Sequence, residues 1–543
     1  MGDDRVALLG SSNSKDGYGS LSSGLDLFPP GTKSKIAIDK KQRWISISAA
    51  YIGSFVMFVQ GSLYWASLWP YLSQLDPTVP ESFFGFVIAV FALGQALSAP
   101  ILGYWSNKCK NTKTPMLAGY VINIFGNLWM TFAEAYPVSA RRWILLVSRF
   151  IAGLGTGNSG VIQAYLAQSS TLEERNKVMS LQAATISLAV MAGPGLQAAF
   201  VPLGYDGFSS GYFYFNMYTA PAYLSICFSL ISIVLTLCFW KDYNISVEEE
   251  DNHDEISSKT LPKYDMLAAI TCVFMRFIIL YCVVYDDTIG SPFTMAMFNW
   301  NREEAVLYNG IIQAVSGILD FVGNLVVGNV LLNYVRERTV MVCGVISFLL
   351  FYIISFSWPG LPDFNNITYI PEENRSLIST TTPLFTSTEE PEDLAIGCNY
   401  VWCAYTTRIY LAQYIVAYCF LVLAFSVGFT PATTLFSKIL GPRRQGTMQG
   451  IFVSSGSVAM TLSPVMVSFF FESFGPRVAW GIAIALVLLA LVAVLYSYKR
   501  LLPYGARKMS GISDDEDLRR ILYNTDVRRS HSLCRYDSLA EPY

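Results

Sequence analysis

The sequence predicts an all-α multi-pass membrane protein with twelve transmembrane helices in two six-helix bundles. The first observation is composition: of 543 residues, 53 % are hydrophobic and 14 % are charged, whereas a soluble domain has about 25 % charged residues. The second is patterning, because apolar runs of the roughly 20 residues that cross a bilayer recur twelve times. The third is a charged segment at 241–263, which divides these runs six and six.

The polar segment 1–43 is rich in Ser and Gly and lacks the apolar core of a signal peptide, so we expect a disordered cytoplasmic tail. The N-terminal bundle, 44–240, contains the predicted spans 44–69, 82–105, 116–136, 143–167, 177–201 and 216–240. A cytoplasmic linker at 241–263 follows. The C-terminal bundle, 264–498, contains the predicted spans 264–289, 305–332, 339–357, 408–430, 447–471 and 477–498. The polar segment 499–543 predicts a second cytoplasmic tail.

The distribution of Lys and Arg predicts that both termini are cytoplasmic, because positive charges concentrate in cytoplasmic loops. The opposite loops hold only Arg141, Arg142, Arg302, Arg375, Arg408 and Arg477. The longest of them, 358–407, is therefore predicted to be lumenal or extracellular. It contains glycosylation sequons at Asn366 and Asn374, which only a translocated loop can use. It also contains Cys398 and Cys403, a candidate disulfide in an oxidising compartment.

Composition also argues against several functions. The net charge of −3 and the lack of a basic-aromatic patch give no sign of a nucleic-acid partner. The two histidines, His253 and His531, lie in polar segments, which excludes a histidine metal site or proton relay within the apolar body. The sequence shows no pairing of a nucleophile with a base and no cluster of metal ligands. We therefore expect no enzyme activity, no metal and no cofactor.

A glycine run at 153–160 poses an alternative, because Gly155 to Gly160 fits the G-x-G-x-x-G pattern of a dinucleotide-binding loop. The run lies inside the predicted fourth span, however, with no strand before it and no acidic residue at the ribose-binding spacing. Gly153 and Gly157 share one helix face, and small residues at that spacing let helices approach closely in lipid. The run predicts a tight helix contact that also includes Gly155.

Three motifs resemble those of the major facilitator superfamily. Arg149-x-x-x-Gly153-x-Gly155 resembles its fourth-helix signature, and Gly193-Pro194 in the fifth span resembles its Gly-Pro motif. Between the second and third spans, Gly103 and Asn107 occupy the place of its G-x-x-x-D-R/K loop. The resemblance implies the major facilitator fold and a transport function. The asparagine stands where the family has an acid, which removes a charge from the cytoplasmic gate.

Four longer stretches resemble one branch of this superfamily. They are SLWPYLSQLDP at 67–77, 82–107, 303–312 and 436–446, so they spread over both halves. The resemblance implies a multi-pass protein of lysosomal and late endosomal membranes, with chloride-conducting activity.

Sorting signals in the tails agree with that location. Asp4-x-x-x-Leu8-Leu9 fits the acidic dileucine pattern, and Tyr536 with Leu539 fits the tyrosine-based pattern. Clathrin adaptor complexes read such patterns as addresses, and the patterns themselves anchor nothing. The tails therefore predict adaptor complexes as partners.

Ionisable side chains inside a membrane are candidate functional residues by default. The predicted spans contain five: Arg149, Arg276, Asp286, Asp287 and Asp320. In the superfamily, helices one, four, seven and ten line the central cavity, so the resemblance implies that Arg149, Arg276 and Asp287 meet there. Mid-membrane burial favours the neutral form of an unpaired carboxyl, which makes Asp320 a candidate proton carrier.

Structural alternatives stand beside these roles. Arg276 and Asp320 could form an ion pair that only fixes packing, and Asp286 and Asp287 could be solvated at the lumenal headgroups. Residues 290–292, Gly-Ser-Pro, could form a hinge just after the acidic pair.

Three functions remain open from the sequence. The arginines favour movement of a small anionic solute, with chloride conduction implied by the resemblance. The carboxylates favour a proton-coupled carrier of a small organic solute. A transport-dead adaptor or receptor is the third, and the buried charges count against it, because a scaffold has no use for them.

Overall fold

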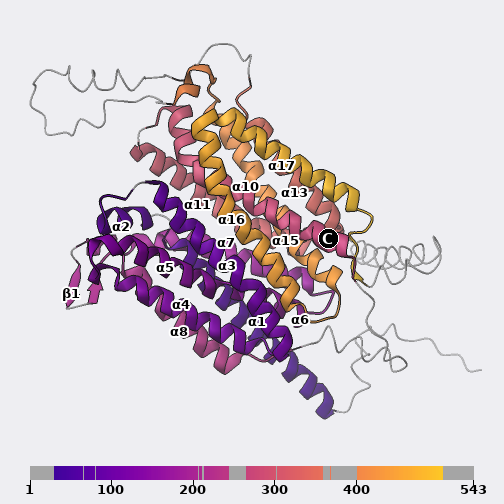
Figure 1. Ribbon diagram of the computed structural model, residues 1–543. Coiled ribbons are helices and arrows are strands. Elements are labelled where there is room, and N and C mark those ends of the chain that lie inside the picture. The colour runs from indigo at the N-terminus through magenta and orange to yellow at the C-terminus, as the bar shows by residue number, and fades with distance from the viewer. Residues whose placement is uncertain are drawn as a thin grey trace, which may run out of the picture.

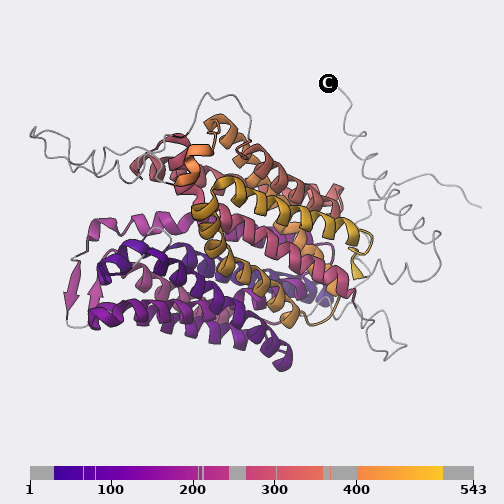
Figure 2. The ribbon, with the colours of Figure 1, turned by 45° about the horizontal axis from the view of Figure 1, so that its top comes forward.

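The computed structural model describes residues 30–64, 67–79, 81–205, 207–210, 213–243, 264–300, 302–358, 367 and 400–504. These residues form two helical bundles that follow one another in the chain, the first coloured indigo to magenta and the second pink to yellow (Figure 1). Figure 2 shows the first bundle as a layer beneath the second. The mostly helical, two-bundle fold class predicted from the sequence is confirmed.

The first bundle contains eight labelled α-helices, short 3₁₀ turns and a small hairpin. Its elements are α1 Pro30–Ser62, α2 Leu68–Leu75, α3 Glu81–Cys109, α4 Lys113–Thr131, η2 Ala133–Ala135, α5 Val138–Thr156, α6 Asn158–Gln168, α7 Arg175–Ala198, η3 Val201–Leu203, β1 Phe208–Ser210, β2 Phe213–Phe215 and α8 Ala220–Phe239.

The second bundle begins after the linker. Its elements are α10 Met266–Phe298, α11 Arg302–Val326, the π-helical η4 Val327–Leu331, α12 Leu332–Tyr334, α13 Glu337–Ile354, η6 Val401–Tyr405, α15 Leu411–Leu440, α16 Gly446–Phe474 and α17 Pro476–Ser497.

Ten helical segments of the described chain are long and apolar enough to cross a membrane. The remaining two predicted spans, 116–136 and 143–167, coincide with α4 and with the pair α5 and α6. Helix α4 buries the polar Asn123 and Asn127, and α5 carries three arginines, so both are less apolar than the rest. The number twelve and the side on which the termini lie stay predictions.

Several boundaries differ from the predicted ones in the first bundle. Helix α1 begins at Pro30, so residues 30–43 are helical rather than part of the polar tail; proline suits a first helical turn because that turn needs no N–H there. The first span also ends earlier, at Ser62, and α2 is a separate short helix. The fourth span is interrupted at Gly157, between α5 and α6.

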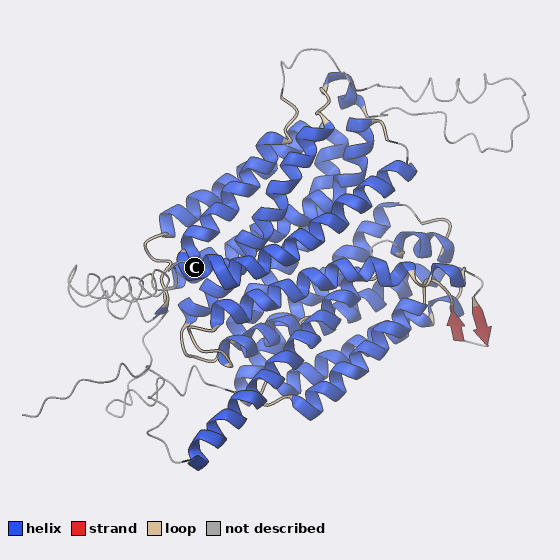
Figure 3. Ribbon diagram, turned by 180° about the vertical axis from the view of Figure 1, so that it is seen from behind, coloured by secondary structure: helices blue, strands red, loops and turns tan. Residues whose placement is uncertain are grey.

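A two-stranded antiparallel hairpin, β1 and β2, lies in the connection between α7 and α8, where the sequence predicted no strand (red in Figure 3). Phe208 pairs with Phe215 and Ser210 with Phe213. Gly207 precedes it with a φ of +43°, a left-handed conformation that favours glycine.

The largest difference in the second bundle is the length of α10. The predicted span ends at 289, but the helix continues through the Gly-Ser-Pro segment to Phe298. Thr294 Oγ1 donates to the carbonyl oxygens of Gly290 (2.9 Å) and Ser291 (3.0 Å) in this turn. Asp286 therefore lies about 18 Å from the end of the helix at a rise of about 1.5 Å per residue. Asp286 is buried among the helices, and the alternative position of the acidic pair at the lumenal headgroups stays a prediction.

Each bundle has its own apolar core. One core of the first bundle surrounds Tyr51 and Tyr165, and another surrounds Tyr64 and Tyr71. The core of the second bundle extends along α10 from Ala268 to Met297. The core of the second bundle also includes Ala183 of α7, so the two bundles touch through apolar as well as polar contacts.

Candidate functional site

The bundles meet at their predicted cytoplasmic ends through α3 and α16. Asn107 Nδ2 donates to Thr447 Oγ1, and the backbone N–H of Gly446 donates to Asn107 Oδ1, both at 2.9 Å. A Cβ added at Gly103 would overlap the carbonyl of Gly446, so only glycine allows this approach. The neutral Asn107 thus joins the bundles as both donor and acceptor, without the charge that the family pattern has here.

The same seam continues toward the middle of α3. Ser454 Oγ donates to the carbonyl oxygen of Ala96 (2.7 Å), and Ser457 Oγ donates to Gln95 Oε1 (2.9 Å). A further bond runs from Thr461 Oγ1 to the carbonyl oxygen of Ala89 (3.5 Å). Small hydroxyl side chains on α16 therefore bond to α3 over half of its length.

A second seam joins α7 of the first bundle to α11 and α15 of the second. Ser187 Oγ donates to Asp320 Oδ2. Asn324 Nδ2 donates to Asp320 Oδ1 and to Ser187 Oγ, both at 3.1 Å, and Thr430 Oγ1 donates to Asn324 Oδ1 (2.6 Å). Ser180 Oγ donates to the carbonyl oxygen of Asn324. Asp320 therefore lies in a network that ties the two bundles together.

The π-helical segment η4 belongs to this seam. A Cβ added at its Gly328 would overlap the side chain of Ser180 on α7, so the irregular turn brings α11 against the opposite bundle. Hydrogen bonds between described residues of the two bundles run from the predicted cytoplasmic ends to about the helix middles. The structure is therefore closed on the predicted cytoplasmic side.

A cavity lies between α10, α11 and α15, nearer the predicted lumenal side. Its walls include Asp286, Asp287, Asn309, Gln313, Tyr414 and Tyr418, and its volume is about 80 Å³. Asp286 is buried, at 9 % exposure, and Tyr352 Oη donates to its Oδ2 (3.3 Å). Asp287 is exposed. Sequence reasoning named the two acids, and Gln313 two turns from Asp320, but missed Asn309 and the two tyrosines of the cavity wall.

Arg149 is buried inside the first bundle. Its guanidinium carbon lies 3.8 Å from the centre of the Tyr64 ring, and its Nη2 lies 2.7 Å from Met130 Sδ. Tyr64 Oη in turn donates to Asn127 Oδ1 (2.9 Å). The buried Nε of Arg149 has no hydrogen-bond partner. Aromatic stacking therefore holds this cation.

Arg276 is held in a similar way inside the second bundle. Its guanidinium carbon lies 5.0 Å from the Phe429 ring centre and 4.6 Å from the Phe452 ring centre. Its Nε and Nη1 are buried without a hydrogen-bond partner. Gly456 on α16 makes room for the side chain, because a Cβ there would lie 3.1 Å from Arg276 Nε.

The structure does not bring Arg149, Arg276 and Asp287 together. The contacts of Arg149 lie in the first bundle and those of Arg276 in the second. The spacing from 276 to 287 corresponds to about 16 Å along a helix. Arg276 and Asp320 form no ion pair either, since Asp320 accepts from Ser187 and Asn324 instead.

The glycine motifs lie at helix crossings. A Cβ added at Gly153 would overlap the carbonyl oxygen of Phe91 on α3, and one at Gly157 would overlap Ser98 Oγ. Gly155 lies against the carbonyl of Gly119 on α4. Gly193, next to Pro194, packs on Ser62 of α1. These close contacts occur at the glycines for which the sequence predicts tight helix packing.

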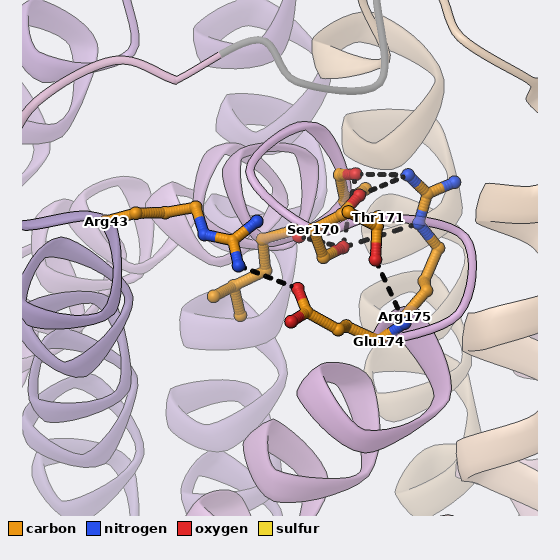
Figure 4. A network of polar contacts seen from close by, with 7 residues as sticks. Arg43, Ser170, Thr171, Glu174 and Arg175 are labelled. Carbon is orange, nitrogen blue, oxygen red and sulfur yellow. Dashed lines mark hydrogen bonds and ion pairs between the residues drawn. The ribbon is translucent and has the colours of Figure 1, made fainter. Parts of the chain in front are cut away.

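A polar network at the predicted cytoplasmic end of the first bundle was not anticipated (Figure 4). Arg43 Nη2 donates to Glu174 Oε2 (2.9 Å), and the backbone N–H of Glu174 donates to Thr171 Oγ1 (3.2 Å). Arg175, fully buried, donates from Nη2 to the carbonyl oxygens of Ser170 (3.0 Å) and Ala167 (2.5 Å). The network fixes the turn between α6 and α7 against α1; its sequence signal is the Thr171-x-x-Glu174 spacing.

Some predicted sites lie outside the described residues. They are the sorting residues Asp4, Leu8, Leu9, Tyr536 and Leu539, the sequon residues Asn366 and Asn374, and Cys398. Cys403 is described, and it is disulfide-bonded.

Two helical bundles in sequence, closed along two paired seams and containing buried charges, define a secondary-transporter fold. The chain belongs to the Major Facilitator Superfamily, whose sequence profile matches residues 50–371 and 394–524. It is therefore a multi-pass membrane protein of a family of solute transporters, not of enzymes.

Two relatives illustrate the range of this family. The chain is 30 % identical to major facilitator superfamily domain-containing protein 8 of Xenopus laevis over 481 residues, which are 86 % of this chain and 93 % of that protein. It is 25 % identical to multidrug resistance protein 2 of Bacillus subtilis over 276 residues, 50 % of this chain and 63 % of that protein.

Solved structures share the fold at low sequence identity. The human organic anion transporter MFSD10 (TETRAN) matches with a TM-score of 0.56 and 14 % identity, covering 83 % of this chain and 99 % of that one. The proton:xylose symporter XylE bound to 6-bromo-6-deoxy-D-glucose matches with a TM-score of 0.61 and 13 % identity, covering 86 % and 97 %.

Proposed function

We propose that this protein is a proton-coupled secondary transporter of a small organic solute, working by alternating access of its two bundles. The observation that carries the proposal is Asp320. It is a carboxylate at the middle of a membrane helix, and it accepts hydrogen bonds from Ser187 of the opposite bundle and from Asn324.

Protonation of Asp320 would weaken this seam. An ionised carboxylate accepts from both neighbours with its two oxygens, whereas the protonated acid carries one O–H that donates, so one of its oxygens is a poorer acceptor. Ser187 has another acceptor within its own helix, the carbonyl oxygen of Ala183 at 3.1 Å. The seam can therefore release on protonation without leaving Ser187 unsatisfied, and this links proton binding to movement of the bundles.

Names of relatives do not select the solute. They include a multidrug resistance protein, an organic anion transporter and a proton:xylose symporter. Proton coupling in the proton:xylose symporter supports a proton-coupled mechanism for this fold, but it does not bear on Asp320 itself.

Reconstituted full-length protein with a trapped pH dye tests the proposal. Pooled small metabolites are added outside the vesicles, and proton movement and solute exchange are recorded together. We expect a pool that moves protons with wild type, and we expect Asp320→Asn to lose proton movement while it retains exchange. Solute flux without any proton movement in wild type would show a carrier of another kind.

Anion conduction is the second candidate function, because Arg149 and Arg276 are buried cations whose unpartnered N–H groups could attract chloride. A voltage clamp of enlarged endolysosomes, with chloride varied on one side, tests it. We expect a current that reverses near the chloride equilibrium potential and falls in Arg149→Gln and Arg276→Gln. Unchanged current in both variants would exclude this pathway.

The proposed location is the lysosomal and late endosomal membrane, with clathrin adaptors as partners and a glycosylated lumenal loop. The support is the dileucine signal of the N-terminal tail and the sequons. Replacing Leu8 and Leu9 by Ala is expected to move the protein to the plasma membrane, measured by surface biotinylation. Persistence in lysosomes would show that another signal dominates. A transport-dead adaptor is excluded by any measured flux.

A further inference from the structure

The cavity between α10, α11 and α15 is lined by two acidic side chains and by no basic one. Asp286 and Asp287 lie next to each other on α10, and no Lys or Arg is among the residues that line the cavity. Its volume of about 80 Å³ holds several water-sized groups, since one needs about 10–15 Å³.

In the buried acid of this pair, one of the two carboxyl oxygens lacks a hydrogen-bond donor. Asp286 is 9 % exposed, and Tyr352 Oη donates only to its Oδ2. Its Oδ1 is buried and has no hydrogen-bond partner. A buried carboxylate oxygen without a partner is unfavourable by the full cost of its desolvation, so a donor from outside the chain, either water or a bound solute, would stabilise it.

The neighbouring acid adds a requirement for positive charge. Two ionised carboxylates on adjacent residues repel each other, and the repulsion is stronger where one of them is buried, as Asp286 is. A cation between Asp286 and Asp287 would remove that repulsion and supply the missing donor. A neutral donor would supply only the hydrogen bond.

The remaining walls suit an ammonium group. Asn309 donates its Nδ2 to Thr294 Oγ1 (2.8 Å), which leaves its Oδ1 to accept a hydrogen bond. The rings of Tyr414 and Tyr418 lie 5.8 Å apart on the α15 side. Ammonium groups donate to carboxylate and amide oxygens and are attracted to aromatic faces, so each of the three helices offers at least one contact of the right kind.

We propose that this cavity binds the protonated amine of the transported solute. The inference rests on the proposed transport function and extends it, because it names the class of solute: a small organic cation. Gln313 on the cavity wall and Asp320 lie about 10 Å apart along α11. The structure therefore separates the solute site from the proton site.

Three probes of one shape and different charge test the inference: benzylammonium, benzyl alcohol and benzoate. Binding is measured as the thermal shift of purified full-length protein in nanodiscs, with sodium and potassium chloride as separate arms. We expect benzylammonium alone to stabilise the wild type. Asp286→Asn and Asp287→Asn each remove a charge-assisted contact and should weaken its binding by about tenfold to a hundredfold.

A matched variant serves as the control. Glu472→Gln removes an exposed carboxylate at the predicted lumenal end of α16, and it should bind benzylammonium as wild type does. Equal stabilisation by benzyl alcohol or benzoate would overturn the inference. So would retained binding in both cavity variants, or an equal effect of sodium or potassium, which would assign the cavity to an inorganic cation.

Binding is measured without a gradient, so the two proposals fail separately. If the protein binds benzylammonium but moves no protons, the proposed amine site stands and the proposed proton coupling fails. If the protein moves protons with a metabolite pool but does not bind benzylammonium, the proposed proton coupling stands and the proposed amine site fails.

Discussion

Asp76, which caps α2 in the predicted lumenal loop, shows how single side chains hold the connections between helices. Its Oδ1 accepts from the Thr78 hydroxyl (2.6 Å) and from the Thr78 backbone N–H (3.0 Å). Arg142 Nη1 lies 3.6 Å from its Oδ2. The Thr78 hydroxyl bond, aided by the backbone bond and Arg142 against the opposing effect of burial, lowers the pKa of this carboxyl below its usual value.

A lowered pKa in the folded state has a definite consequence for stability. Asp76 stabilises the fold at pH values above its unfolded-state pKa of about 3.9, and this contribution disappears as pH falls through the lower folded-state pKa. We predict that Asp76→Asn lowers the free energy of unfolding by about 1 kcal/mol at neutral pH. Thermal unfolding in detergent from pH 7 downward measures it.

The matched control for this prediction is Arg142→Gln. An ion pair at 3.6 Å, with Arg142 one-third exposed, contributes little, so this variant should lose far less. Wild type and Asp76→Asn should converge in the most acidic samples. A constant difference at every pH would show that the asparagine harms packing rather than the charged hydrogen bonds.

At the scale of elements, glycines decide how closely α5 approaches its neighbours. A Cβ at Gly153 would overlap the backbone of Phe91, and backbone cannot move aside as a flexible side chain can. We predict that Gly153→Ala costs about 1–3 kcal/mol of stability through overpacking. The melting temperature of the purified protein, together with its yield, measures this loss.

Gly195 provides the control within the same half of the chain. A Cβ at Gly195 would have nothing within 4 Å, so Gly195→Ala should be neutral or stabilise by up to about 1 kcal/mol. If both variants lose stability alike, the close approach of Phe91 does not explain the loss at Gly153.

Helices whose bounds follow from the length of an apolar run were predictable from the sequence. Helices whose bounds depend on tertiary contacts were less predictable. The ten strongest spans follow from hydropathy. The extension of α10 to Phe298 does not, because a Gly-Ser-Pro segment is a local stop signal that bundle packing overrides. The interruption at Gly157 and the π-helical η4 lie where a glycine packs against a residue far away in the sequence, Ser98 and Ser180 respectively.

For the candidate site, the charged residues were predictable from the sequence and most of their contact partners were not. Membrane burial of a charge is visible in sequence, so all five ionisable candidates could be named. Their partners could not, because Tyr64 with Arg149, and Phe429 with Arg276, lie on different helices. Asn324, four residues after Asp320 and on the same helix face, was the one partner with a local signal.

For the whole molecule, closure on one side predicts that movement of the bundles must break the α3–α16 seam. Asn107 and Thr447 are hydrogen-bonded across it, and the nearby backbones of Gly103 and Gly446 are in contact. Cysteines at 107 and 447 are therefore the pair to test for a disulfide across this seam. The background needs Cys109→Ser, since Cys109 is free, exposed and two residues away.

We predict that the oxidised Asn107→Cys, Thr447→Cys protein loses proton-coupled flux by at least about tenfold, because a locked predicted cytoplasmic side cannot open. Benzylammonium binding should persist, since the cavity lies nearer the opposite side. Reduction should restore flux, and each single-cysteine variant should transport with or without oxidant. Full flux with a complete cross-link would mean that solute crosses without the bundles separating at this seam, and a channel-like pathway would then replace alternating access.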